Sequence, residues 1–286
     1  MYKINKVALN LKRKVEIAVI SDVYLGAKAC YANQLLTYLN SIAPKTLILN
    51  GAIFDASTLQ KGKFPKSHLK VIEKINDYAA NGTKVIYVTD NNDKSHRQFI
   101  NREIDNISII NKLVIDLDGR KVWFFNGEVF AFYFEKSRWL KAFKNSSFSI
   151  FLRFNQYTNW FLNKLRKNRF LLQKNTPRDI KSAPKYIAEF EKTVTDLAIA
   201  NGYDFVVCGH TQQPKILTKN TRKGKTTYLN SGDWVENFTA LEYQFKRWKL
   251  YNYKNDKLTP FFADMDIKDM TTQNLIAALT IVEQPH

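Results

Sequence analysis

Polar residues that could bind a metal ion or a phosphate recur where apolar segments of the sequence end. They lie in five short stretches: "SDVYLG" (21–26), "NGAIFD" (50–55), "TDNND" (89–93), "FNGE" (125–128) and "GHTQ" (209–212). Carboxylate and amide oxygens suit hard divalent cations, and neutral imidazoles complete coordination without cancelling all the charge. Ligands of open α/β sheets gather where strands end at their carboxyl side, so we expect these stretches to lie together.

The elements that must position these stretches alternate along the chain. Apolar, β-branched runs predict strands at 15–22, 46–51 and 83–90, and helical spacing predicts helices at 32–42 and 67–82. Ser67 is the expected N-cap of the second helix and Gly82 its end. This order predicts a parallel βαβ sheet covered on both faces. Further along we expect a hairpin within 107–128 that turns at Asp118–Gly119, a helix over 184–202, a strand over 204–210 and antiparallel strands within 226–234 and 238–253.

Taken in order, the five stretches resemble the motifs of calcineurin-like metallophosphoesterases: D-x-H, G-D-x-x-D, G-N-H-D, H-G-D and G-H-x-H. Within that superfamily the chain resembles the bacterial UDP-2,3-diacylglucosamine diphosphatases of lipid A biosynthesis, through "LNGAIFD", "FPKSHLKVI", "VVCGH" and "YLNSGDWVENFTALEY". The resemblance runs from about Val15 to Tyr253. It implies a layered α/β fold, a central β-sandwich flanked by helices, with a basic helical lid. It also implies hydrolysis of a phosphoester or pyrophosphate by two divalent ions, commonly Mn²⁺.

Most of the family's site residues are replaced in this chain. Asp22, Asn91 and His210 keep residues found at ligand positions of the family. The replaced ligand positions are Tyr24, Ala52, Asn126 and Gln212, and Asn92 stands where the family has its catalytic histidine. Ala52 takes the place of the bridging carboxylate, without which two nearby cations repel each other strongly. We therefore expect no catalytic residue and no resident cofactor.

Three interpretations of the surviving residues remain open. Asp22, Asn91 and His210 are either relics that satisfy local backbone groups, or ligands of one Mg²⁺ or Mn²⁺ ion or a phosphate. A third interpretation is a rebuilt carboxylate site that would support an active hydrolase, since such oxygens suit hard cations. Its ligands would be Asp22, Asp55, Asp90, Asp93 and Glu128.

The charge of the chain is concentrated in one segment. The chain has 44 Lys and Arg against 26 Asp and Glu, a formal net charge of +18. Residues 136–185 hold 13 of these basic residues, one acid and nine aromatic residues. Basic and aromatic residues on opposite helix faces are typical of a helix that lies in a membrane interface. The predicted lipid contacts are Arg138, Trp139, Lys141, Phe143, Arg153, Trp160, Lys164, Arg166, Lys167 and Arg169.

Other partners of this segment rank lower. A solvated charge run and an acidic protein partner are alternatives, and nucleic acid comes last because no DNA- or RNA-binding motif is visible.

The 45% of hydrophobic residues predicts a sizeable core, and Cys30 and Cys208 are expected to be buried, reduced thiols. No targeting segment or membrane span is visible, which predicts a cytoplasmic protein, peripheral at the inner face of the cytoplasmic membrane.

The expected organisation is one domain over 1–258 with the lid inserted at about 130–185. A tail follows over 259–286, in which 274–282 could dock as a helix. The leading hypothesis is a catalytically inactive homologue, a pseudoenzyme, of the diphosphatase. It would bind an anionic membrane or a phosphorylated glycolipid without two-metal hydrolysis. The alternative is an active phosphoesterase or pyrophosphatase that uses the rearranged carboxylate site.

Overall fold

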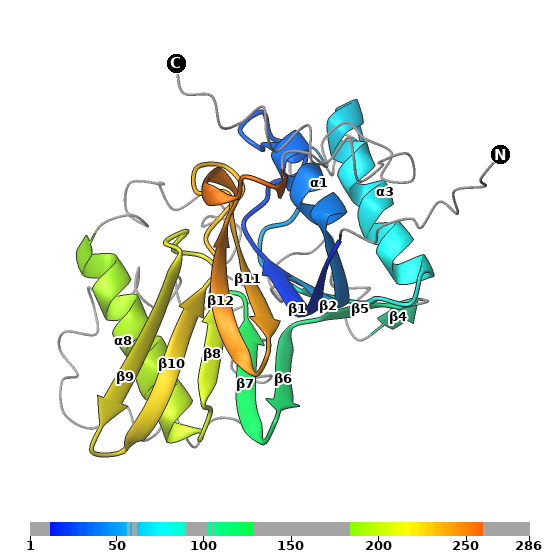
Figure 1. Ribbon diagram of the computed structural model, residues 1–286. Coiled ribbons are helices and arrows are strands. Elements are labelled where there is room, and N and C mark those ends of the chain that lie inside the picture. The colour runs from blue at the N-terminus through cyan, green and yellow to red at the C-terminus, as the bar shows by residue number, and fades with distance from the viewer. Residues whose placement is uncertain are drawn as a thin grey trace.

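The structure is a computed structural model that describes residues 12–55, 58, 62–89, 102–104, 106–127 and 184–259. Its strands form two sheets that pack face to face (Figure 1). The seven-stranded sheet contains, in spatial order, β12 (Arg247–Asn252), β11 (Thr239–Gln244), β1 (Arg13–Ile20), β2 (Ile42–Asn50), β3 (Lys84–Val88), β5 (Ile107–Ile110) and β4 (Arg102–Ile104). The five-stranded sheet contains β6 (Lys112–Leu117), β7 (Arg120–Phe125), β8 (Phe205–Cys208), β10 (Gly224–Asn230) and β9 (Lys215–Thr221).

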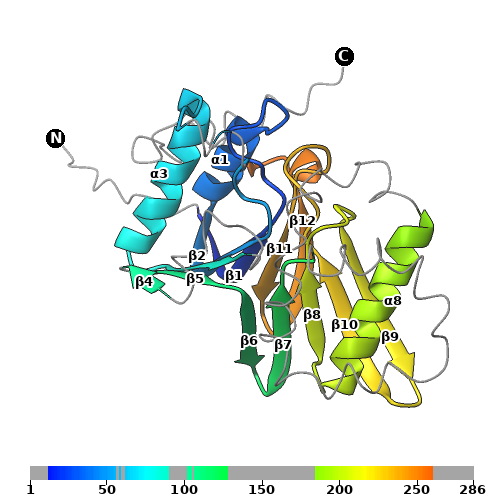
Figure 2. The same cartoon turned by 180° about the vertical axis from the view of Figure 1, so that it is seen from behind.

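Helices cover the outer face of each sheet. The helices α1 (Ala32–Ser41) and α3 (Lys66–Ala80) lie against the seven-stranded sheet, and α8 (Pro184–Ala200) lies against the five-stranded sheet (Figure 2). A short 3-10 helix, η4 (Tyr253–Asn255), follows β12. The layers are therefore helix, sheet, sheet, helix. This confirms the predicted α/β fold with a central β-sandwich flanked by helices.

The direction of the strands decides where polar residues can meet. In the first sheet β1, β2 and β3 pair in parallel, as the βαβ pattern predicts, and in the second sheet β7, β8 and β10 do. Residues that follow these strands therefore emerge at the carboxyl edge of their sheet. The hairpin turns between β6 and β7, β9 and β10, and β11 and β12 lie at the opposite end (Figures 1 and 2).

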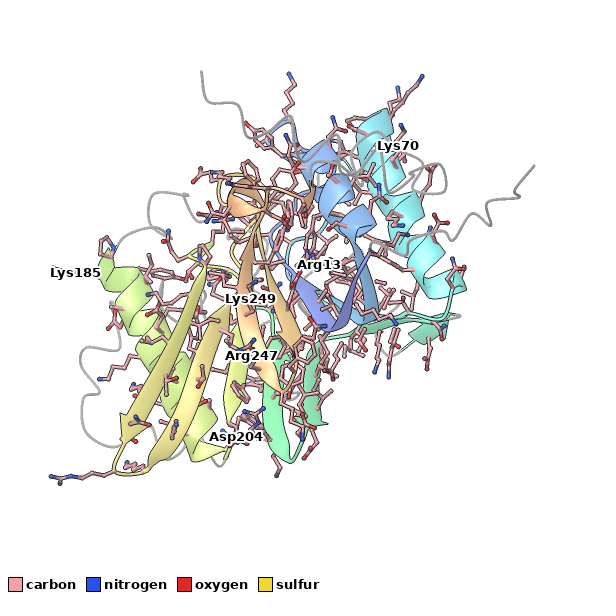
Figure 3. All side chains as sticks on the ribbon, viewed as in Figure 1. Arg13, Lys70, Lys185, Asp204, Arg247 and Lys249 are labelled. Carbon is pink, nitrogen blue, oxygen red and sulfur yellow. The ribbon has the colours of Figure 1, made fainter. Side chains whose placement is uncertain are left out.

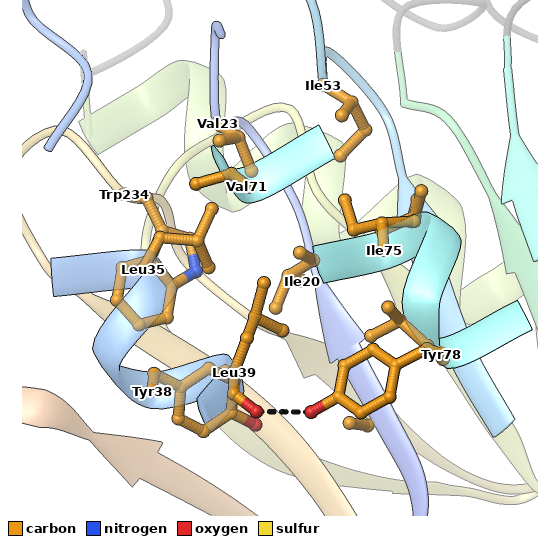
Figure 4. Close-up of a cluster of buried hydrophobic side chains, with 14 of the residues drawn as sticks. Ile20, Val23, Leu35, Tyr38, Leu39, Ile53, Val71, Ile75, Tyr78 and Trp234 are labelled. Carbon is orange, nitrogen blue, oxygen red and sulfur yellow. Dashed lines mark hydrogen bonds between the residues drawn. The ribbon is translucent and has the colours of Figure 1, made fainter. Parts of the chain in front are cut away.

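Three apolar clusters hold the layers together. Between the sheets lie side chains that alternate along their strands: Val19, Ile48, Val88, Phe124, Val207 and Leu229. The helix layer above the first sheet packs Leu35 and Leu39 of α1 in one cluster with Val71, Ile75 and Tyr78 of α3 (Figure 4). The Tyr78 hydroxyl donates to the backbone oxygens of Leu39 and Ile42, which ties α3 to the end of α1. The third cluster lies under α8 and includes Phe190, Val194, Val206 and Tyr228.

Three details differ from the sequence prediction. Residues 107–110 form a separate strand that pairs with β3, because their apolar residues extend the first sheet; the hairpin begins only at Lys112. Ser67 is wrong as the N-cap, since α3 begins at Lys66 and Pro65 precedes it. The strand β9 was not expected; its burial pattern shows little of the apolar alternation that reveals a strand.

Several predicted residues lie outside the described part of the chain. They are Asp90, Asn91, Asn92, Asp93 and Glu128, every residue named above as a lipid contact, and the segment 260–286. Cys30 and Cys208 are buried and form no disulfide, which confirms that prediction. Within the described ranges, no helix combines the length and the apolar character that crossing a bilayer requires.

Candidate functional site

Residues from both sheets meet at the carboxyl edge of the sandwich. The backbone N–H of His210, two residues after β8, donates to Oδ2 of Asp22, two residues after β1, over 2.9 Å. Asn126 directly follows β7. A Cβ atom on Gly51 would lie 3.8 Å from both Asp22 Oδ1 and Asn126 Oδ1. The expectation that these stretches gather is confirmed for four of the five. We use the term strand-end cluster for Asp22, Tyr24, Ala52, Asn126, His210 and Gln212.

Glycines allow this close approach. A Cβ atom on Gly209 would lie only 2.9 Å from Oδ2 of Asp22, and one on Gly127 would lie 2.5 Å from Cβ of His210. Both distances are below normal van der Waals contact, so a larger residue would push the two sheets' loops apart. Asp22 and His210 are each 3% exposed and Asn126 is also buried, whereas Tyr24, Ala52 and Gln212 are half-buried.

The backbone of the strand-end cluster is strained. Asp22, Tyr24, His210 and Gln212 have φ values of +50°, +55°, +71° and +54°. Each residue with a side chain costs about 1–2 kcal/mol in this left-handed region, and such residues gather at functional sites. The N–H groups of Val23 and Tyr24 both donate to the Ala52 oxygen, at 2.9 and 3.0 Å, and hold the loop in place. These loops thus have the strained backbone that is common at functional sites, although most of their side chains differ from those of the resembled family.

Tyr24 and Gln212 bind each other. Nε2 of Gln212 donates to the Tyr24 hydroxyl over 3.1 Å, and that hydroxyl lies 3.5 Å from Oδ1 of Asp22. Asn237 fixes Gln212 further by donating to its backbone oxygen over 3.0 Å. Two neutral side chains thus form a hydrogen-bonded pair where the resembled family has two metal-binding imidazoles.

His210 is engaged through its ring as well as its backbone. The Tyr186 hydroxyl, in the first turn of α8, lies 2.8 Å from Nε2 of His210. The ring of Phe190, one turn further along α8, lies 5.6 Å from the imidazole, centroid to centroid. A histidine binds a metal through a nitrogen lone pair, so coordination through Nε2 would require this hydrogen bond to break or turn away.

The described residues do not fit a two-metal centre. Ala52 has no donor atom at the bridging position, and no three His, Cys, Asp or Glu side chains in the described ranges come together as a metal site. Asp55, a candidate of the rebuilt carboxylate site, accepts from N and Oγ1 of Thr58 at 2.8 and 2.9 Å. It caps its own turn, and Asp90, Asp93 and Glu128 of that site lie outside the described ranges.

Burial and the charge of Asp22 disfavour a further negative charge at Cys208, which lies two residues before His210. Burial raises the pKa of the Cys208 thiol well above its ordinary value, and the charge of Asp22 raises that pKa further. Nearby, Asn50 is fully buried at the end of β2; its amide nitrogen donates weakly to the Val207 oxygen over 3.5 Å. Its Oδ1 finds no hydrogen-bond partner among the described residues. A buried water molecule is the simplest donor for this oxygen.

Sequence reasoning missed Tyr186, Asn237 and His68. Tyr186 and Asn237 reach the cluster from elements far along the chain, and no local pattern announces such contacts. His68 is buried on α3, where its Nδ1 accepts the Gly26 N–H over 2.7 Å and supports the loop after β1. Burial also lowers the pKa of His68.

The chain was compared with protein families, curated proteins and solved structures. No protein-family model matches the chain, and neither does any curated protein. The similar solved structures include a conserved protein of Streptococcus pneumoniae described as a predicted phosphoesterase, with 13% identity, a TM-score of 0.35 and coverage of 84% of this chain and 90% of that one. A novel archaeal phosphodiesterase has 12% identity, a TM-score of 0.40 and coverage of 82% and 98%. Vacuolar protein sorting 29 of Cryptosporidium parvum has 12% identity, a TM-score of 0.34 and coverage of 82% and 94%. These values are too low to say anything about activity or partners.

Proposed function

We propose that the protein is a pseudoenzyme of the UDP-2,3-diacylglucosamine diphosphatase type. It keeps the layered fold and the cluster at the carboxyl edge, and it lacks two-metal hydrolysis. The observation that carries the proposal is the hydrogen-bonded state of the cluster. Tyr24 and Gln212 bind each other, His210 binds Tyr186, and Ala52 offers no oxygen to a cation.

The loss of two-metal hydrolysis has an electrostatic reason. Two cations a few ångströms apart repel strongly at low dielectric unless an anion lies between them. Metal-assisted phosphoryl transfer also needs both ions to clamp the phosphate and to generate a hydroxide near neutral pH. In the described cluster Asp22 is the one formal negative charge, and its Oδ2 already accepts the His210 N–H. One carboxylate so placed does not balance two divalent cations.

We propose further that the protein binds an anionic surface: the inner face of the cytoplasmic membrane or a phosphorylated glycolipid. The support is the net charge of +18 and its concentration, with aromatic residues, in the segment between β7 and α8. Anionic headgroups attract each nearby Lys or Arg by about 1 kcal/mol. The residues from Arg138 to Arg169 named above remain the predicted contacts.

The proposal is tested by measuring turnover. Full-length protein is purified without chelators and assayed with UDP-diacylglucosamine and with a chromogenic phosphodiester in the presence of Mn²⁺ or Mg²⁺. We expect no turnover above that of an Asp22→Asn variant. Turnover comparable to an intact diphosphatase, lost in Asp22→Asn, would instead establish the rearranged hydrolase.

A further inference from the structure

The tip of the hairpin between β11 and β12 carries an exposed aromatic ring. The Phe245 side chain is 76% exposed, more than any other large apolar residue in the described ranges. The turn consists of Phe245 and Lys246 alone, between the paired residues Gln244 and Arg247. Their φ values are +51° and +60°. Two-residue turns of this kind favour Asn-Gly, because other L-residues are strained there.

This turn is also held rigidly. Nη2 of Arg120, on the neighbouring hairpin, donates to the Lys246 oxygen over 2.7 Å. The Tyr243 hydroxyl donates to Oδ2 of Asp118 over 2.7 Å, and Nζ of Lys246 lies 3.9 Å from the other oxygen of that carboxylate. The two hairpin turns therefore brace each other. A bulky aromatic residue kept in a strained and exposed position does not serve the stability of the hairpin, and such an outlier points to function.

Basic residues occur in the Phe245 hairpin and in the two hairpins that end on the same side of the sandwich. Three hairpin turns project from the same end of the sandwich, which we name the three-turn end (Figures 1 and 2). Its basic residues are Arg120, Lys121, Arg222, Lys223, Lys225, Lys246 and Arg247. Its acids are Asp116, Asp118 and Asp204, the last of which Figure 3 labels at this end. All three accept hydrogen bonds: Asp118 as described, Asp116 from the Gly119 N–H over 2.7 Å, and Asp204 from the Lys121 N–H over 2.8 Å. The net charge of the three-turn end is positive.

The three-turn end lies opposite the strand-end cluster. It stands at the amino ends of β7 and β10, whereas Asn126 and Ser231 follow their carboxyl ends. The basic segment leaves the described chain after Gly127 and rejoins it at Pro184, next to the helical turn whose Tyr186 contacts His210. Both junctions therefore belong to the cluster's end of the molecule. The three-turn end is a separate surface.

We infer that the three-turn end docks onto an anionic lipid bilayer, with the Phe245 ring entering the boundary between headgroups and acyl chains. Basic residues that flank an exposed aromatic residue match the chemistry of such a surface. A convex tip suits a deformable bilayer, whereas a protein partner would need a preformed pocket for the ring. This inference rests on the anionic membrane of the proposed function, but it assigns a membrane contact to the three-turn end in addition to the basic segment.

Vesicle co-sedimentation of the full-length protein tests this inference. The vesicles contain phosphatidylglycerol and phosphatidylethanolamine, and phosphatidylcholine vesicles serve as the neutral comparison. The diagnostic variant carries Phe245→Asn and Lys246→Gly together, which suits the turn. We expect its melting temperature to equal or exceed that of the wild type, and its partition onto anionic vesicles to fall about tenfold or more.

Matched controls come from α3, at the other end of the molecule. Leu69 is also an exposed apolar residue, at 41%, and Lys70 is an exposed cation that Figure 3 labels. Leu69→Ala with Lys70→Gln removes one apolar group and one charge, and we expect less than a twofold change. Replacing Arg222 and Lys223 by Gln leaves the ring in place, and we expect partition to fall several-fold and its salt dependence to weaken.

Each remaining outcome overturns the inference. Equal partition of the hairpin variant and the wild type places the contact elsewhere, such as the basic segment, and leaves the proposed function intact. Equal binding to neutral and anionic vesicles removes the role of charge. No binding of the wild type to either vesicle, together with hairpin-dependent binding to polyglutamate, indicates an acidic protein partner. None of these results bears on the turnover assay, so this inference and the proposed loss of two-metal hydrolysis fail separately.

Discussion

The hydroxyl of Tyr186 lies 2.8 Å from Nε2 of His210 and joins the first turn of α8 to the loop after β8. His210 is the only histidine of the strand-end cluster, and its backbone N–H is bound as well, to Asp22. Because its ring binds Tyr186 and its backbone binds Asp22, His210 links the two sheets to the helix that covers one of them. We therefore expect His210 to contribute to stability, although the resembled family uses this position to bind metal.

Replacing Tyr186 by Phe tests this link. The variant removes one partly buried hydrogen bond and no apolar volume, so we expect the free energy of unfolding to fall by about 1 kcal/mol. Urea denaturation measures it. The matched control is Tyr203→Phe, at the other end of α8, because the Tyr203 hydroxyl makes no hydrogen bond within the described residues. Equal losses in both variants would contradict the assigned role.

Restoring the family's ligands tests the interpretation of the cluster. The variant carries Tyr24→His, Ala52→Asp, Asn126→His and Gln212→His. We expect excess Mn²⁺ to raise its melting temperature by about 5–10 °C and to leave the wild type unchanged. The same variant with Ser in place of Asp at position 52 should respond far less, since it lacks the bridge. If Mn²⁺ raised the melting temperature equally with Asp and with Ser at position 52, the bridging carboxylate would not be decisive for metal binding. No turnover is expected while position 92 is Asn.

The two thiols provide a test of burial. Burial raises the pKa of Cys30 to about 12 and the pKa of Cys208 well above its ordinary value. The reactive species is the thiolate, so at mildly alkaline pH both cysteines are neutral and shielded in the folded protein. We expect Ellman's reagent to label neither thiol quickly in the native state and both in denaturant. Rapid labelling of one native thiol would place that cysteine at the surface.

The helix layer makes a prediction of its own. The Tyr78 hydroxyl donates to two backbone oxygens, of Leu39 and Ile42, at the junction of α1 and β2. Tyr78→Phe leaves both oxygens in an apolar layer, so we expect a loss of about 1–3 kcal/mol in the free energy of unfolding. Tyr253→Phe is the control, because the described structure shows no hydrogen bond from that hydroxyl. A loss no larger than the control's would mean that water replaces the phenol.

The sequence predicts the fold well where its signal is periodic. The strands β1, β2 and β3 and the helices α1, α3 and α8 follow from alternation and helical spacing, and Gly82 and Gly202 end α3 and α8 with positive φ as expected. Short elements were harder. β5 is four half-buried residues and β9 is mostly exposed, so neither carries the pattern of a buried strand. Their placement depends on pairing with distant strands, which one sequence does not reveal.

The strand-end cluster, like the fold, was predicted in part from the sequence. Asp22, Tyr24, Ala52, Asn126, His210 and Gln212 follow strands, and the parallel topology alone brings them to one edge. The partners that now occupy them were not foreseen. Tyr186 lies 24 residues from His210 in the chain, and Tyr24 lies 188 from Gln212. Residue types show that ligands are missing, and only coordinates show which hydrogen bonds have replaced them.

Metal analysis of the purified protein tests the central claim most directly. Protein expressed with supplementary manganese and purified without chelators is analysed by elemental mass spectrometry, followed by calorimetric titration with Mn²⁺. We expect no tightly bound metal and no saturable binding of a pair of ions. Two equivalents of retained metal, released when Asp22 is replaced by Asn, would contradict it.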